Sequence, residues 1–446
     1  MRKILRKTAI ILLWLIIWQL LSAWVDSEIL LVSPVWAAGR FLTLLPDLKF
    51  WQVILHSMVR IGSGFLLGVA VGLVLAVFAG RFSFLEELFR PVMTLCKTVP
   101  IASFVVLLLI WWGSAYLAVA ICFLIVLPNI YISALEGIRS TDVRLVEMAS
   151  VFHMSLRNRF FYIYRPALRP FLDSSLKLSL GMCWKSGVAA EVIGTPEFSI
   201  GEQLYFSKIH LDTADLFAWT AVIILLSICF EKIVLKLVAV FFAWEPECRG
   251  QFVVNSRRKC REQINNKPMS DETLPEKIEI TNLSKSFGEL EVLKDFNAVY
   301  GCGETYHFTS PSGSGKTTLF RILCGLEQAD NGTVEPACTY SVMFQEDRLC
   351  EEYSAVRNVE MVSGDREKAG EALSQLLETE AMDKPCSQLS GGMKRRVALV
   401  RAMEAKSDCV ILDEPFTGMD AGTRAKAEQY IKERQQGRIL LVATHI

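Results

Sequence analysis

No residue between Thr98 and Leu135 carries a formal charge, and this constrains the fold more than any other feature of the chain. A helix needs about 20 apolar residues to cross a hydrocarbon layer ~30 Å thick. The uncharged stretch is therefore long enough for two crossings, which we expect to be joined by a tight turn at Gly113-Ser114. Thr8–Val25 and Ile61–Gly80 are also uncharged. The first part of the chain predicts an all-helical membrane domain.

Charge distribution orients the predicted helices. Basic residues stand before the first apolar run, and the positive-inside rule then places the N-terminus in the cytoplasm: Arg2, Lys3, Arg6 and Lys7. A cleaved signal peptide is the alternative, but the apolar run is long and no small-x-small cleavage site follows it. Six crossings are expected: Thr8–Val25, Ile61–Gly80, Val99–Trp112, Ala115–Leu135, Leu176–Gly194 and Leu216–Val238.

The segment from Glu136 to Lys177 then falls in the cytoplasm, where its basic residues outnumber its acidic ones. We expect a multi-pass protein of the cytoplasmic membrane, in contact with the lipid bilayer. The net charge of the 446 residues is zero, so it gives no indication of a nucleic-acid partner, and we expect none. The 12 cysteines form no C-x-x-C pair, which favours free thiols.

Hydrophobic patterning divides the chain into three parts. We expect a membrane domain over residues 1–243, a solvated linker over 244–276 and a soluble α/β domain over 277–446. Three segments have the pattern of strands: Ile278–Ile280, Cys409–Leu412 and Ile439–Val442. The expected fold is thus an all-α membrane domain of about six helices followed by an α/β phosphate-loop domain.

A phosphate-binding loop is predicted between an apolar strand, Tyr306–Phe308, and a helical pattern over Thr318–Leu323. Glycines in such a loop let backbone N–H groups surround anionic oxygens, while a lysine adds positive charge and a Ser/Thr hydroxyl binds magnesium. Ser310 stands where the pattern G-x-x-x-x-G-K-[ST] has its first glycine. The predicted nucleotide site comprises Ser310, Pro311, Ser312, Gly313, Ser314, Gly315, Lys316, Thr317 and Thr318.

Two more motifs support a nucleotide site. An apolar strand ends in Asp413 and Glu414, which suit a magnesium ligand and a base for the attacking water. A strand ending in a solvated acidic turn is the alternative. The L-S-G-G core containing Ser390, Gly391 and Gly392 opens a helix, and its free N–H groups suit an anion. The alternative there is an ordinary capped helix.

These motifs in this order resemble the ATPase domain of ATP-binding cassette transporters. The resemblance implies ATP and Mg²⁺ as cofactors and a sandwich dimer, in which Ser390–Gly392 of one chain closes on the γ-phosphate held by the other. It implies that Phe287 stacks on adenine and that Gln345 binds magnesium and contacts the permease. It further implies that Asp420 lies in a subunit-bridging loop and that His445 contacts the γ-phosphate. Thr317, Gln345 and Asp413 are the implied metal ligands.

The sequence departs from the family pattern at several positions. Ser310 replaces a glycine, and Met393 replaces the usual glutamine while keeping its backbone N–H. The chain ends one residue after His445, where family members continue, so we expect a less secure final strand. We therefore expect nucleotide binding to be better preserved than hydrolysis.

The membrane domain also resembles a family, the importer permeases that dock on such ATPases. The segments Glu147–Ser155 and Tyr164–Pro170 are similar to the docking loop of those permeases, with His153 in place of its glycine and Arg165 in place of its leucine. Two short amphipathic helices, with Ala149 at a close contact, are expected to seat beside Gln345. A basic cytoplasmic loop without a docking role is the alternative.

The segment Gly181–Gly194 resembles the sulfonate, taurine and nitrate branch of these permeases. Charges at bilayer depth cost ~2.5–3.5 kcal/mol each on insertion scales, so Lys185 needs either a partner or a water-filled path. We expect it to pair with Glu231.

The sequence thus predicts a fused half-transporter that works as a homodimer or with related subunits. ATP hydrolysis, with Glu414, His445 and Gln345 as catalytic residues, would drive import of a small sulfonate-, taurine- or nitrate-like solute delivered by an external binding protein. Two alternatives remain at this level. A half-size exporter also joins membrane and ATPase domains in this order, and a non-transporting ATP sensor would account for Ser310.

Overall fold

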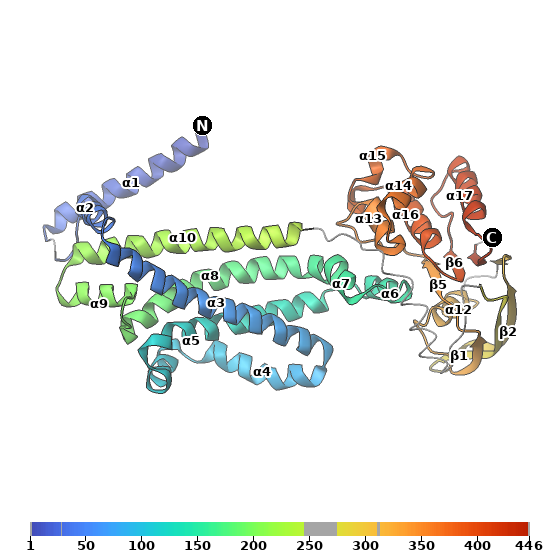
Figure 1. The fold of residues 1–446 in the computed structure, drawn as a ribbon, viewed down its shortest axis with the longest axis horizontal. Coiled ribbons are helices and arrows are strands. Elements are labelled where there is room, and N and C mark those ends of the chain that lie inside the picture. The colour runs from blue at the N-terminus through green and yellow to red at the C-terminus, as the bar shows by residue number, and fades with distance from the viewer. Residues whose placement is uncertain (1, 28, 245–273, 310–312, 445–446) are drawn as a thin grey trace. The chain divides into compact units, whose positions relative to one another are not determined.

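The structure is a computed structural model that describes residues 2–27, 29–244, 274–309 and 313–444 (Figure 1). Its contacts separate two compact units. The first comprises Met1–Ser140 and Ala167–Trp244, and the second comprises Thr141–Pro166 and Glu245–Ile446. The segment 141–166, which the sequence places between two membrane helices, therefore packs as part of the unit that contains the α/β domain. Most of the predicted linker, residues 245–273, lies outside the described residues.

The first unit is entirely helical in its described residues. Its helices are α1 (Arg2–Val25), α2 (Pro34–Leu44), α3 (Leu48–Arg81), α4 (Ser83–Thr98), α5 (Ile101–Arg139), α8 (Arg165–Gly194), α9 (Ile200–Ile209) and α10 (Thr213–Ala243). Among the described residues, three helical segments are long and apolar enough to cross a membrane: Thr8–Val25, Leu48–Arg81 and Ile101–Arg139. Six crossings therefore stay a prediction. Charges along α8, such as Asp173 and Lys177, reduce its apolar length.

Helix α5 is broken at Gly113, where the backbone has φ 72° and ψ −178°. Only glycine adopts this conformation without strain. Val105 and Leu108 before the break pack in one cluster with Leu117 and Ile121 after it. The predicted turn at Gly113-Ser114 is confirmed.

Glycines let α3 approach α5 closely. A Cβ atom on Gly64 would lie 2.5 Å from the carbonyl oxygen of Val119, and one on Gly68 would lie 2.8 Å from Cβ of Val126. Both distances are too short for a side chain. Gly64 and Gly68 of the second predicted span therefore form a contact surface for α5, as small residues do between membrane helices.

Helical structure also extends outside the crossings predicted from the sequence. Helix α3 contains the predicted crossing Ile61–Gly80 but begins earlier, at Leu48, because Asp47 caps its N-terminus by accepting from the backbone N–H of Lys49. The charged segment Arg81–Lys97 largely forms a separate helix, α4, which contains Pro91. The polar segment before α10 also contains a helix, α9.

The second unit contains two sheets (Figure 1). An antiparallel sheet has the order β2-β1-β4, and a parallel sheet has the order β3-β7-β6-β5. The strands are β1 (Lys277–Phe287), β2 (Leu290–Gly301), β3 (Thr305–Phe308), β4 (Asn331–Glu335), β5 (Tyr340–Met343), β6 (Cys409–Asp413) and β7 (Ile439–Ala443). The three strands predicted from apolar patterning lie within β1, β6 and β7.

The described helices of this unit pack against the parallel sheet or against one another. They are α6 (Val143–Val151), α7 (Leu156–Arg159), α12 (Lys316–Leu323), α13 (Ala355–Ser363), α14 (Arg366–Ser374), α15 (Thr379–Met382), α16 (Gly391–Glu404) and α17 (Ala421–Arg434). Every residue of β6 and β7 is buried, as expected for parallel strands covered on both faces. The loops that follow β3, β5 and β6 leave the same edge of the sheet, which is where α/β proteins place their ligands.

Candidate active site

The predicted phosphate loop joins β3 to α12, and its described part is shaped by two glycines. Gly313 has φ 85° and Gly315 has φ 83°, a conformation that favours glycine. A Cβ on Gly315 would lie only 2.9 Å from the carbonyl oxygen of Val292. Gly315 precedes Lys316, the first residue of α12, so the helix N-terminus opens at the lysine. Such a terminus attracts anions. Ser310, Pro311 and Ser312 lie outside the described residues.

The acidic end of β6 meets the loop that follows β5. Asp413 is the last residue of β6 and is buried. Glu414 has a left-handed backbone, with φ 53°, and its N–H donates to the carbonyl of Ala443 at 3.0 Å. Gln345 donates from Nε2 to Oε1 of Glu414 at 3.3 Å. The structure thus brings together two residues that the sequence predicted separately.

Arg395, in α16, ties these two segments together and was not predicted. Its side chain is buried, and its guanidinium donates to five acceptors: the carbonyls of Phe344, Gln345, Asp413 and Glu414 and the carboxylate of Asp347. The carbonyl distances for Gln345 and Glu414 are 2.8 and 2.7 Å. In sequence Arg395 lies in a run of three basic residues, which has the pattern of a solvated face. Only the fold shows that one member points inward.

Helix α16 begins as predicted, at the L-S-G-G core, which we call the signature motif, and α16 is the signature helix. Ser390 is its N-cap, and its Oγ accepts from the N–H of Met393 at 3.3 Å. Met393 therefore supplies the same backbone donor as the glutamine it replaces. Gly392 lies close to the next loop, since a Cβ on it would lie 3.0 Å from the carbonyl oxygen of Gly418.

Asp420 caps α17. Its Oδ1 accepts from the N–H of Thr423 at 2.9 Å, and its Oδ2 accepts from the hydroxyl of Thr423 at 2.8 Å. These bonds lower the pKa of Asp420, the backbone bond being the larger cause, so the carboxylate stays ionised.

Phe287, predicted to stack on adenine, lies at the end of β1 with 48% of its surface exposed. Nζ of Lys285 lies 5.3 Å from the ring centroid of Phe287, within the range of a cation–π contact. Two ion pairs hold that ammonium group, with Glu327 at 3.1 Å and Asp330 at 3.2 Å. His445 lies outside the described residues.

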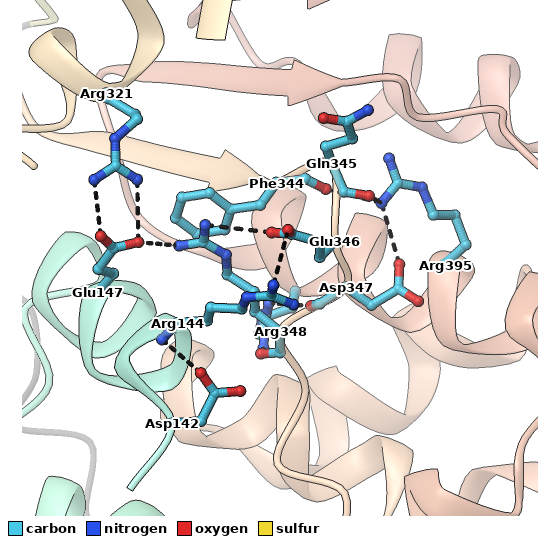
Figure 2. A network of polar contacts seen from close by, with 11 residues as sticks. Asp142, Arg144, Glu147, Arg321, Phe344, Gln345, Glu346, Asp347, Arg348 and Arg395 are labelled. Carbon is cyan, nitrogen blue, oxygen red and sulfur yellow. Dashed lines mark hydrogen bonds and ion pairs between the residues drawn. The ribbon is translucent and has the colours of Figure 1, made fainter. Parts of the chain in front are cut away.

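Glu147, in the segment 141–166, forms ion pairs with two arginines of the α/β domain, Arg321 and Arg348 (Figure 2). Its Oε1 lies 2.8 Å from Nη2 of Arg321 in α12, and its Oε2 lies 2.7 Å from Nη1 of Arg348. Hydrogen bonds from Arg321 first, and also from Arg348, lower the pKa of Glu147. Arg321 belongs to the helix that begins at Lys316, and Arg348 follows Gln345 by three residues.

Arg348 is fixed by further contacts, which Figure 2 shows. Its guanidinium lies 3.8 Å from the ring centroid of Phe344, and its Nη2 lies 3.4 Å from Oε2 of Glu346. Glu346 also lies 3.7 Å from Arg144 at the start of α6. The segment 141–166 therefore packs beside Gln345, as expected from the sequence.

The turn after α6 uses a histidine in place of glycine. His153 has φ 48°, and the next residue, Met154, donates from its N–H to the carbonyl of Ala149 at 2.9 Å. The helix thus ends in a left-handed residue without glycine. Ala149 is fully buried, in the same cluster as Phe344, as the predicted close contact requires.

The predicted metal ligands suit magnesium better than a transition metal. Asp413 supplies a carboxylate, Thr317 an exposed hydroxyl and Gln345 an amide oxygen. Within the described residues, no group of three or more His, Cys, Asp or Glu side chains could hold a metal ion. Mg²⁺ prefers hard oxygen ligands and is usually held by few side chains together with phosphates and water. The donor set therefore fits the ion.

In the first unit, the predicted pair of Lys185 with Glu231 is wrong. No ion pair joins them among the residues that the structure describes. Trp184, the neighbour of Lys185, points inward and its ring lies 5.8 Å from that of Phe230 in α10, so Lys185 is exposed on another side of α8. Glu191 of the same helix is buried, 1% exposed, and accepts from the hydroxyl of Ser57 at 2.7 Å.

Comparisons with known proteins agree with this geometry. Residues 293–417 match the model of the family described as ABC transporter, and residues 68–239 match the family described as binding-protein-dependent transport system inner membrane component. The aliphatic sulfonates import ATP-binding protein SsuB 1 of Rhodococcus jostii (strain RHA1) is 38% identical over 178 residues, which cover 38% of this chain and 72% of that protein. The chain belongs to the ATP-binding cassette transporter family. It joins an importer-type permease and an ATPase in one polypeptide.

Other matches concern the ATPase part of this transporter. The sulfate/thiosulfate import ATP-binding protein CysA of Synechococcus elongatus (strain ATCC 33912 / PCC 7942 / FACHB-805) is 33% identical, over 35% of this chain and 51% of that protein. A solved dimer of the ATP-binding cassette MJ0796, bound to ADP and Pi, is 27% identical over 38% of this chain and 88% of that one, with a TM-score of 0.36. The chain spans 49% to 72% of the curated relatives named here and their neighbours.

Proposed function

We propose that two copies of this transporter use ATP hydrolysis to import a small anionic solute across the cytoplasmic membrane. The observation that carries the proposal is the position of Glu147. This residue of the permease loop is bonded both to Arg321, on the helix of the phosphate loop, and to Arg348, beside Gln345. A change in the nucleotide site would therefore be transmitted directly to the loop.

The residues divide the chemistry of hydrolysis among them. Glu414 would orient the attacking water and accept its proton, which leaves the carboxyl protonated while the bond from water oxygen to the γ-phosphorus forms and the bond to the leaving oxygen breaks. Gln345 would hold Glu414 in place through their hydrogen bond. Mg²⁺, held by Thr317, Gln345 and Asp413, would neutralise charge on the phosphates.

ATP binding would use residues from both copies. Backbone N–H groups of residues 310–318 and Lys316 would hold the phosphates, while Phe287 would stack on adenine. Ser390, Gly391 and Gly392 of the other copy would close on the γ-phosphate, with Asp420 at the seam and His445 at the γ-phosphate. One chain supplies one phosphate loop and one signature helix, so two complete sites need two chains.

The substrate class is proposed from the relatives. Two of them are named as import proteins for aliphatic sulfonates and for sulfate/thiosulfate, and both classes are small sulfur oxyanions. The matched permease family is described as binding-protein-dependent, which supports delivery by an external binding protein. We retain the proposed division into a permease domain over 1–243, a linker over 244–276 and an ATPase domain over 277–446, with six crossings.

The importer-type permease match argues against the exporter alternative. ATP turnover would distinguish the proposed importer from a non-transporting ATP sensor. We expect the purified chain in lipid nanodiscs to hydrolyse ATP with magnesium, and Glu414→Gln to abolish hydrolysis while ATP binding persists. A wild-type chain that binds ATP without turnover would favour the sensor, and one that binds no nucleotide would contradict the proposal.

A further inference from the structure

Tyr353 lies between Arg348 and α13, and both its hydroxyl and its ring contact the segment 141–166. Its hydroxyl donates to the carbonyl of Phe161 at 2.9 Å and accepts from Nη2 of Arg165 at 3.0 Å. Its ring packs edge-on against Tyr162, with 5.0 Å between centroids. Only 7% of its surface is exposed. Arg165 is the residue that replaces a leucine in the permease pattern, so the hydroxyl of Tyr353 gives this unusual arginine a polar partner.

The main chain of the same residue is bonded in another direction. The carbonyl of Tyr353 accepts from the N–H of Cys386 at 2.9 Å and from Nδ2 of Asn358 at 3.3 Å. Next to it, Ser354 forms an isolated antiparallel bridge with Pro385. The carbonyl of Glu351 accepts from the N–H of Ser387 at 3.0 Å. These bonds make a short two-stranded contact that ends just before Ser390.

We propose that Tyr353 transmits the position of the permease loop to the signature motif. The inference rests on the proposed function, because transport requires the loop to move and Tyr353 would carry that movement to the signature motif. The hydroxyl of Tyr353 is hydrogen-bonded to Arg165 and to the carbonyl of Phe161. Its own carbonyl accepts from the N–H of Cys386, which lies four residues before the N-cap Ser390. The loop therefore acts on two elements of the ATPase: through Glu147 on the chain's own phosphate site, and through Tyr353 on the motif that closes on the other copy's ATP.

The contacts are suited to transmission because Tyr353 is buried and its hydroxyl is hydrogen-bonded both as a donor and as an acceptor. A phenol has one donor and accepts in the remaining direction, and both are occupied here. A buried hydrogen-bonding group that loses its partner is costly, so Arg165 and Tyr353 will move together in preference to separating.

Hydrogen exchange of the full chain in nanodiscs of phosphatidylethanolamine and phosphatidylglycerol, with and without MgATP, tests this directly. Tyr353→Phe keeps the ring and the main chain and removes only the hydroxyl. We expect exchange of the amides of residues 386–392 to rise about threefold to tenfold, the range that corresponds to one lost hydrogen bond. Arg165→Met should produce the same rise at a distance in sequence, and Arg165→Lys, which retains a donor, should restore protection.

The double variant decides the matter. When Tyr353 is already Phe, Arg165→Met should add no further exchange at 386–392. Additive effects, or no effect of Arg165→Met on these amides, would overturn the proposal. Tyr430→Phe is the matched control, because this buried tyrosine donates to Glu404 at 2.7 Å, remote from the loop. Absence of ATP turnover in the wild-type chain would contradict the proposed function. The hydrogen-exchange result tests the role of Tyr353 independently of turnover.

Discussion

Gln345 donates a hydrogen bond from its side-chain amide to the carboxylate of Glu414 across 3.3 Å. The two residues follow neighbouring parallel strands, β5 and β6, and are far apart in the sequence. A carboxylate that is to accept a proton from water must be held in one orientation, and this bond supplies such a restraint.

Glu414→Gln should lower kcat for ATP hydrolysis by about 10²- to 10⁴-fold, because an amide cannot accept the proton from water. The affinity for ATP should stay within about twofold, since the phosphates are held by other groups. Steady-state hydrolysis and nucleotide-binding titrations measure the two effects. Glu404→Gln, which alters a carboxylate bonded to Tyr430, serves as the control. Equal loss in both variants would show that Glu414 is structural.

Arg395→Met should lower kcat by about tenfold to a hundredfold with little change in KM for ATP. The substitution removes the partner of four carbonyls and releases the segments that carry Gln345 and Glu414. Arg395→Lys should not restore turnover, because one ammonium group cannot reach both segments. Lys394→Met, next to it, removes only an ion pair with Glu351 and should change little. A rise in KM without a fall in kcat would contradict this role.

The two ion pairs of Glu147 should make the free energy of unfolding depend on pH. Its pKa is lowered from 4.5 in the folded chain, so its contribution is complete above about pH 4.5 and is lost as pH falls through the folded value. At pH 7, Glu147→Gln should lower the free energy of unfolding by about 1–3 kcal/mol. The difference in the free energy of unfolding between wild type and Glu147→Gln should shrink as the pH is lowered. Thermal unfolding at several pH values measures it.

Glu346→Gln is the control for that experiment. Its carboxylate is half exposed and lies 3.4 Å from Arg348, so solvent screens the interaction and the effect on unfolding should be small. A gap for Glu147→Gln that stays constant down to pH 3 would argue against an ionised Glu147 as the cause.

Gly64→Ala should destabilise the permease unit by about 1–3 kcal/mol, because its Cβ would lie 2.5 Å from a backbone oxygen of α5. The melting temperature in detergent should fall. Gly181→Ala is the matched control in another long helix, since no atom lies within 4 Å of the added Cβ. If both variants melt together with the wild type, α3 and α5 do not depend on this close approach.

Local patterns predicted much of the fold because they act over a few residues. The uncharged run around Gly113 predicted a helical hairpin, since neither half can leave an apolar layer with its backbone unpaired. Apolar runs predicted β6 and β7, and Ser390 predicted the start of α16 through its hydroxyl. The apolar run predicted a crossing from Ile61 but not the start of α3 at Leu48, because that start is set by the capping carboxylate of Asp47.

The sequence by itself therefore determined that the chain is a helical membrane domain joined to a nucleotide-binding α/β domain, and it indicated a loop and a helix N-terminus that suit phosphate binding. Only the tertiary structure decided which charged side chains are solvated and which are paired. Arg395, Arg165 and Glu147 have the same local pattern as surface residues, whereas Lys185 was expected to need a partner and has none of the predicted kind. The reason is physical: burial and pairing depend on groups that folding brings from distant parts of the chain, and no local spacing records them.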